Sequence, residues 1–255
     1  MHAAFKSLFR GGTQNAAERT PIVVAQSHYV LKKHVVHPPF PEGVSFAVFA
    51  TGCFWGTEKM FWRLPGVYAT STGYIAGDVP HPTYEEVCSG RTGHAECVRV
   101  AYDAKTVSFA DLLAMHWTCH DPTQGNRQGN DTGSQYRSGI YCATEAQLKM
   151  AQASAEAYQA VLKANGRGAV ITTEIKGPGD VFYFAEDYHQ QYLAKPGARP
   201  YCSAQPTGLG MPADWLEANG AKFSPGFWKR YGPRPGCTIG VPNEPISLAD
   251  ALAEK

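Results

Sequence analysis

The sequence predicts an α+β protein: a two-layer α/β sandwich around a mixed β-sheet, with a long irregular C-terminal tail. Three observations favour this class. Strand-like and helix-like segments are interleaved without the strict repetition of βαβ units. The 255 residues are 44% apolar, enough for one large domain or two small ones. Glycine and proline, at 26 and 18 residues, are frequent enough for many loops and too few to indicate disorder.

The predicted elements begin at residue 45 and are separated by glycine, proline or a polar cap. Pro65 ends the first helix, Thr83 opens the second with a capping-box pattern, and Ser108 caps the third. The expected strands are Ser45–Ala50, Val67–Gly73, Ala95–Tyr102, Tyr136–Ala143, Ala169–Lys176 and Val181–Ala185. The expected helices are Cys53–Leu64, Thr83–Gly90, Ser108–Trp117, Thr144–Asn165 and Glu186–Lys195.

Three regions follow from this pattern. Residues 1–40 have no sustained periodicity and lead into a proline-rich stretch, so they are interpreted as an N-terminal extension, a linker or a targeting segment. Residues 41–200 are predicted to form the main folded domain. Residues 201–255 are rich in proline and glycine, and the aromatic residues after position 212 indicate that this segment packs on the domain.

Composition excludes several classes of protein. The formal net charge is +1, which gives no general attraction to nucleic acid or to an anionic membrane. No apolar run approaches the roughly 20 residues that span a bilayer. The N-terminus lacks the apolar core of a secretory signal. We therefore expect a cytoplasmic protein; Lys6, Arg10 and Arg19 make an organellar transit peptide the alternative.

The seven cysteines form no framework of structural disulfides. An odd number in a chain of this length is unlike a stapled secreted protein, so most should be inert thiols. No pair has C-x-x-C spacing, and Cys88, His94 and Cys97 lack the spacing of zinc ligands, so no metal is expected. Neither G-x-G-x-x-G nor a P-loop is present, so no nucleotide cofactor is expected.

Cys53 is the strongest candidate nucleophile. It lies at a strand-to-helix junction, where backbone N–H groups and the helix dipole favour a thiolate. Gly52 and Gly56 allow a partner to approach the sulfur, and Phe54 and Trp55 supply an aromatic wall. The alternative is an inert cysteine buried at a helix start.

Glu96 is the second anomaly, because it shares the parity of Val98 and Val100 on the apolar side of a strand. Burial raises the pKa of a carboxyl group, so Glu96 could act as a general acid. The alternatives are a carboxylate that reaches water at the strand end, or an ion pair with Arg91.

The segment His120–Ser138 has no apolar period, and such a long loop is usually functional or disordered. It carries Asp131 and Tyr136 between glycines, which is typical of a binding loop. A polar Ω-loop of turn residues is the alternative.

A series of longer motifs runs in order from about Phe40 to Cys202. They are Thr51–Gly56, Glu85–Glu96, His120–Gln124, Gly129–Asp131, Gln135–Ser138 and Ala185–Leu193. Together they resemble the A-type peptide methionine sulfoxide reductases. The resemblance implies a monomeric, thioredoxin-dependent oxidoreductase that needs no cofactor and reduces methionine S-sulfoxide, free or in proteins, thereby repairing oxidative damage.

The resemblance also assigns roles to individual positions. Cys53 is the implied nucleophile and Glu96 the acid that protonates the departing oxygen. Tyr84 and Tyr136 match the tyrosines that hold this oxygen. The pocket for the S-methyl group matches Phe54 and Trp55, the main-chain anchor matches Asp131, and His189 falls in a matching motif, where it either contacts substrate or only supports the fold.

The resolving thiol implied by the resemblance is Cys202, which would condense with a sulfenic acid on Cys53. Many members of the family carry a second resolving cysteine eight or nine residues later, where this chain has Gly210 and Met211. One resolving thiol then suffices, or Cys237 takes a relay role.

Two other functions are compatible with parts of the pattern. A cysteine hydrolase would use Cys53 with His189 as its base. A non-catalytic metal-binding or redox-sensing module would bind zinc or form a disulfide without turnover.

Overall fold

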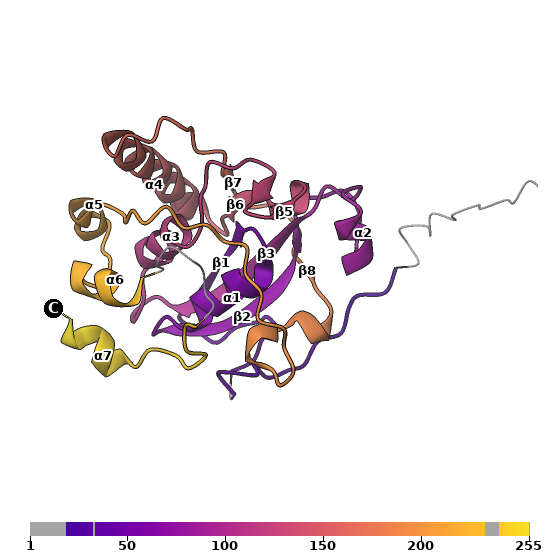
Figure 1. The fold of residues 1–255 in the computed structure, drawn as a ribbon. Coiled ribbons are helices and arrows are strands. Elements are labelled where there is room, and N and C mark those ends of the chain that lie inside the picture. The colour runs from indigo at the N-terminus through magenta and orange to yellow at the C-terminus, as the bar shows by residue number, and fades with distance from the viewer. Residues whose placement is uncertain (1–18, 33, 233–239, 255) are drawn as a thin grey trace, which may run out of the picture.

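The computed structural model describes residues 19–32, 34–232 and 240–254 (Figure 1). Its described part contains a six-stranded mixed sheet in which only the β6–β7 pair is parallel. The strand order is β7 (Glu174–Lys176), β6 (Ser138–Tyr141), β1 (Val44–Thr51), β3 (Ala95–Asp103), β2 (Val67–Ile75) and β8 (Tyr183–Phe184). A separate hairpin joins β4 (Arg127–Gln128) to β5 (Asp131–Thr132).

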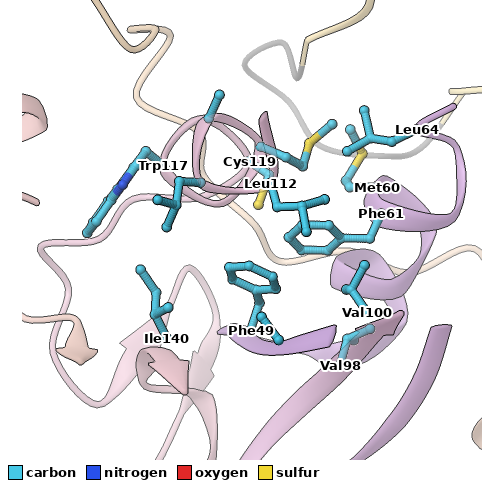
Figure 2. Close-up of a cluster of buried hydrophobic side chains, with 14 of the residues drawn as sticks. Phe49, Met60, Phe61, Leu64, Val98, Val100, Leu112, Trp117, Cys119 and Ile140 are labelled. Carbon is cyan, nitrogen blue, oxygen red and sulfur yellow. The ribbon is translucent and has the colours of Figure 1, made fainter. Parts of the chain in front are cut away.

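Helices cover one face of this sheet and carry most of the core. They are α1 (Phe54–Trp62), α2 (Tyr84–Cys88), α3 (Phe109–Thr118) and α4 (Glu145–Ala164). Figure 2 shows Phe49 and Val100 of the sheet pointing toward Phe61 of α1 and Leu112 of α3. The rings of Phe49 and Phe61 stack with centroids 4.7 Å apart. The two-layer α+β prediction is confirmed.

The opposite face of the sheet is covered by the N-terminal segment rather than by helices. Val24 and Val36 pack on Ala69 and Ala101, the outward-facing residues of β2 and β3. Arg99 of β3 lies over the Phe182 ring at 4.5 Å on the same face. The described part of residues 1–40 is therefore docked on the sheet, and residues 1–18 lie outside the described chain.

The predicted helix over Glu186–Lys195 is wrong. Two short 3₁₀ turns, η3 (Asp187–His189) and η4 (Tyr192–Ala194), occupy this stretch instead. Gln191 between them adopts a left-handed backbone with φ of 47°. This kink lets both the backbone N–H and the side-chain amide of Gln191 reach the buried carboxylate of Glu58, a contact that a continuous helix would not make.

The C-terminal segment packs on the domain, as its aromatic residues predict. It contains three short helices that the sequence pattern does not predict, α5 (Ala213–Ala218), α6 (Pro225–Tyr231) and α7 (Leu248–Ala253). Figure 1 shows α5 and α6 beside α3. Phe223 and Phe227 are buried in the main core, with ring centroids 4.3 Å apart. Within the described residues, no helix has the length and apolar character to cross a bilayer.

Candidate active site

Cys53 occupies the N-cap position of α1, at the turn out of β1. Gly52 makes the turn possible, because its φ is +100° and a Cβ there would lie 2.7 Å from the Gln128 side chain. Burial raises the pKa of the Cys53 thiol well above its usual value, and the charge of Glu96 adds to this. The backbone N–H groups of Trp55 and Gly56 lower it by less. The helix start therefore does not make a resting thiolate, contrary to the expectation from the sequence.

Glu96 points into the same side of the sheet as the apolar residues of β3, and it is only 1% exposed. Its Oε2 accepts a hydrogen bond of 3.0 Å from the Phe54 N–H at the start of α1. Burial raises the pKa of Glu96 to about 8, despite this bond. The carboxyl group is therefore mostly protonated near pH 7. Arg91 is not its partner, since the Arg91 guanidinium lies against Ser89.

Two phenols approach this acid from separate elements. Tyr84 begins α2, where its backbone N–H donates to Glu186 at 2.8 Å. Tyr136 ends η2 (Ser134–Tyr136), in the loop that follows β5. Burial is the main cause of a raised pKa in both tyrosines, and the nearby Glu96 contributes in each case. Both hydroxyls are protonated at neutral pH and can donate hydrogen bonds.

A cavity of about 240 Å³ brings the predicted residues together. A cavity of this size accommodates a thioether side chain and part of its main chain. Its lining residues are Cys53, Phe54, Trp55, Tyr84, Glu96, Asp131, Tyr136, Tyr192, Arg199 and Tyr201. Sequence reasoning missed Tyr192 and Arg199, because they lie where the sequence predicts a helix and an irregular lead into the tail.

Comparison with known proteins agrees with this geometry. A family model described as peptide methionine sulfoxide reductase matches residues 45–210. A peptide methionine sulfoxide reductase of Rhodospirillum centenum is 54% identical over 215 residues, covering 80% of this chain and 95% of its own. The mitochondrial enzyme of Bos taurus is 53% identical, covering 76% and 82%. The chain belongs to the A-type peptide methionine sulfoxide reductases.

The fold leads to the same family. The solved structure of methionine sulfoxide reductase A of Corynebacterium diphtheriae aligns with a TM-score of 0.66 at 44% identity. The alignment covers 76% of this chain and 93% of that one. The protein is thus an enzyme that reduces methionine sulfoxide, and the cavity around Cys53 and Glu96 is its candidate active site.

In this reductase, the aromatic wall of the cavity is fixed from behind by His189. Its Nδ1 accepts a 3.0 Å hydrogen bond from Trp55 Nε1, and its ring packs against Phe54 and Tyr84. Burial lowers the pKa of His189 to about 4, so the imidazole is neutral and able to accept this bond. The ring of Tyr192 stacks on the ring of Trp55, with centroids 4.1 Å apart. His189 thus supports the wall and does not line the cavity itself.

A second buried carboxylate, Glu58 of α1, lies outside the cavity and has no sequence signal. It accepts hydrogen bonds from Thr70 of β2 and from the backbone and side chain of Gln191. His28 from the N-terminal segment bonds Thr70 at 2.8 Å. This network ties α1 to the turns that carry His189 and Tyr192.

The thiols fall into two groups. Cys202 is disulfide-bonded, whereas the free thiols are Cys53, Cys88, Cys97, Cys119 and Cys142. Cys237 lies outside the described residues. Cys53, Cys119 and Cys202 line one small pocket, with Ser203 beside them. Burial raises the pKa of Cys119 to about 12, which makes it a poor nucleophile.

Asp131 is held by the C-terminal segment. Tyr201 and Ser203, on either side of Cys202, each donate a hydroxyl hydrogen bond to one of its carboxylate oxygens. In the part of the chain that the structure describes, no three His, Cys, Asp or Glu side chains cluster closely enough to hold a metal ion.

Proposed function

We propose that this enzyme reduces the S epimer of methionine sulfoxide, free or in proteins, through a sulfenic acid on Cys53. The observation that carries the proposal is the pairing of a free Cys53 thiol with a buried, protonated Glu96 in one cavity. The hydrophobic side of that cavity, formed by Phe54 and Trp55, suits an S-methyl group. Family membership supports the substrate class.

The chemistry needs an acid because a sulfoxide oxygen leaves poorly unless it is protonated. Glu96 at a pKa of about 8 holds a proton at neutral pH, and the hydroxyls of Tyr84 and Tyr136 donate hydrogen bonds to the same oxygen. Cys53 attacks the substrate sulfur as the S–O oxygen is protonated. This attack forms an S–S bond between Cys53 and the substrate, while the protonated oxygen leaves as water. A water molecule then attacks the Cys53 sulfur and breaks this S–S bond, so that methionine is released, Cys53 becomes a sulfenic acid and a proton returns to Glu96.

Resolution of the sulfenic acid is assigned to Cys202. In its thiol form it attacks Cys53, forming a Cys53–Cys202 disulfide and releasing water. Both residues line one small pocket, and a disulfide requires Cα atoms within about 7 Å. A dithiol reductant, thioredoxin in this proposal, then reduces the disulfide, either directly or through a relay to Cys237. The cycle uses one protomer and no metal or organic cofactor.

Asp131 is proposed as the anchor for the main-chain N–H of the substrate. It lines the cavity together with the aromatic wall, and a carboxylate accepts strong hydrogen bonds from an amide. The hydrolase alternative has no support from geometry, because Trp55 occupies Nδ1 of His189 and no hydrogen bond joins His189 to Cys53 in the described structure.

The test is an assay with racemic methionine sulfoxide and dithiothreitol. Half of the substrate should be consumed by the wild-type enzyme, and the Cys53→Ser variant should lose activity to background. Cys142→Ala is the control, because Cys142 is a free, buried thiol that does not line the cavity. Turnover in Cys53→Ser at the level of the control would refute the assignment of the nucleophile.

A second experiment tests the resolving step. Without reductant, the Cys202→Ser variant should release one methionine per enzyme, and it should then stall when thioredoxin is the only reductant. Mass spectrometry of the oxidised wild-type protein, without reduction, separates a Cys53–Cys202 bond from a relay that ends at Cys237. Normal thioredoxin-dependent turnover in Cys202→Ser would transfer the resolving role to another thiol.

A further inference from the structure

The two residues that flank Cys202 are bonded to the same carboxylate. Tyr201 donates to Oδ1 of Asp131, and Ser203 donates to Oδ2. A carboxylate that accepts two hydroxyl bonds fixes the intervening residue more tightly than a single bond would. The backbone at Cys202 is therefore held at a defined place beside the pocket that it shares with Cys53. The docking is seen with Cys202 in a disulfide that leaves Cys53 a free thiol, so it belongs to the oxidised form of the segment.

The docking extends along the β4–β5 hairpin beyond this carboxylate. The N–H of Gln205 donates to the buried side chain of Gln128 at 2.9 Å. Gln124 donates to the side chain of Gln205 at 3.0 Å. Since Gln128 also meets Gly52 at the turn before Cys53, the hairpin touches both the nucleophile's turn and the segment that carries the resolving thiol.

The hairpin is shaped for this contact at Gly129. Its φ is +60°, and a Cβ on it would lie 2.1 Å from the backbone oxygen of Ser203. Gly125, in the same loop, has a similar φ of +67°, but a Cβ there would meet no atom within 4 Å. Both glycines have a left-handed backbone, but only Gly129 lies close to the 201–205 segment. Comparing alanine substitutions at the two positions therefore distinguishes backbone strain from loss of this close contact.

Asp131 has two prospective partners, the substrate and the 201–205 segment. In the proposed function, on which this step rests, it anchors the main chain of the substrate in the cavity. In the structure, both of its oxygens accept bonds from the 201–205 segment. A substrate amide that takes the same lone pairs displaces the hydroxyls of Tyr201 and Ser203, and departure of methionine frees the carboxylate for them again.

We propose that the β4–β5 hairpin is the docking site of the 201–205 segment, with Ser203 as the positioning residue that returns Cys202 to Cys53 once methionine has left. The substrate and the 201–205 segment bind Asp131 in turn. Methionine release therefore precedes formation of the Cys53–Cys202 disulfide. The chemistry of resolution is unchanged: the Cys202 thiol displaces the hydroxyl of the Cys53 sulfenic acid, and a disulfide and water result.

The test separates the two half-reactions in the full-length enzyme. Methionine release and the lifetime of the sulfenic acid, trapped with a dimedone reagent, are followed after one equivalent of substrate. Ser203→Ala should release methionine normally but form the Cys53–Cys202 disulfide about tenfold more slowly, as expected for a lost charge-assisted bond. With dithiothreitol as reductant, the KM of Ser203→Ala should fall about twofold to threefold, because a competitor for Asp131 has been removed.

Matched controls exclude a general loss of structure. Ser247→Ala removes a hydroxyl from the same C-terminal region, where it is hydrogen-bonded to Asp250, and should change neither rate. Gly129→Ala should slow resolution as Ser203→Ala does, whereas Gly125→Ala should not. Wild-type resolution in Ser203→Ala, an unchanged or higher KM, or equal slowing in Gly125→Ala and Gly129→Ala would each overturn the proposal. If Cys53→Ser forms no methionine while Ser203→Ala still does, the proposed function stands even when the docking proposal fails.

Discussion

Two carboxyl groups, Glu96 and Glu58, are fully buried on adjacent parts of the fold, yet they have different tasks. Burial raises the pKa of both, to about 8 in Glu96 and to about 7 in Glu58. Among the described residues, Glu96 accepts one hydrogen bond, from Phe54, and it lines the cavity. Glu58 accepts bonds from Thr70 and Gln191 and does not line that cavity. Equal burial is thus combined with few hydrogen-bond donors at the proposed acid, Glu96, and with many at Glu58.

The largest expected effect is on Glu96. We expect Glu96→Ala to lower kcat by about 10²–10⁴-fold, the usual contribution of a general acid. Glu96→Gln should retain more activity, because its amide still donates a hydrogen bond to the sulfoxide oxygen. Steady-state kinetics with dithiothreitol measures both variants. Similar losses in Glu96→Ala and Glu96→Gln would mean that hydrogen-bond donation is not the main contribution of Glu96.

At Glu58, the same substitution should act on stability first. Glu58→Ala leaves the donors of Thr70 and Gln191 without an acceptor in a buried site, at a cost of about 3 kcal/mol in the free energy of unfolding. Denaturant unfolding monitored by Trp fluorescence measures this. Glu96→Ala provides the comparison, because Glu96 accepts one protein bond and its removal should cost less. A larger stability loss at Glu96 than at Glu58 would reverse the assignment of the two roles.

The smallest effect is the dependence of kcat on pH. In the proposed mechanism the active form of Glu96 is protonated, so kcat should fall as pH rises through about 8, approaching a roughly tenfold loss per pH unit above it. The glutamine in Glu96→Gln does not titrate, so the low kcat of this variant should not fall as pH rises through about 8. A pH profile from about 6 to about 10 measures the difference. If Glu96→Gln declines in parallel with the wild type, a group other than Glu96 controls the profile.

The burial of Glu96 could be predicted because its signal is local. In a strand, side chains two residues apart share a face, and Glu96 shares its face with Val98. The burial of Glu58 could not be predicted, because its partners are residues 70 and 191, which come from distant parts of the chain. The helix predicted around Gln191 failed for the same reason. The backbone is kinked at Gln191, where the side chain bonds to the distant Glu58, and local periodicity carries no information about such a contact. The family motifs predicted most of the residues that line the cavity. The docking of residues 201–205 could be seen only in the three-dimensional structure.

Asp111 links the start of α3 to the C-terminal segment. Its carboxylate completes the capping box with Ser108 and also accepts bonds from the backbone N–H groups of Lys222 and Phe223. One side chain thus closes the first turn of a core helix and fastens a segment more than a hundred positions later. In hydrogen–deuterium exchange, the amides of Asp111 and Phe223 should then lose protection in a single cooperative opening, so that the two regions behave as one unit of local unfolding.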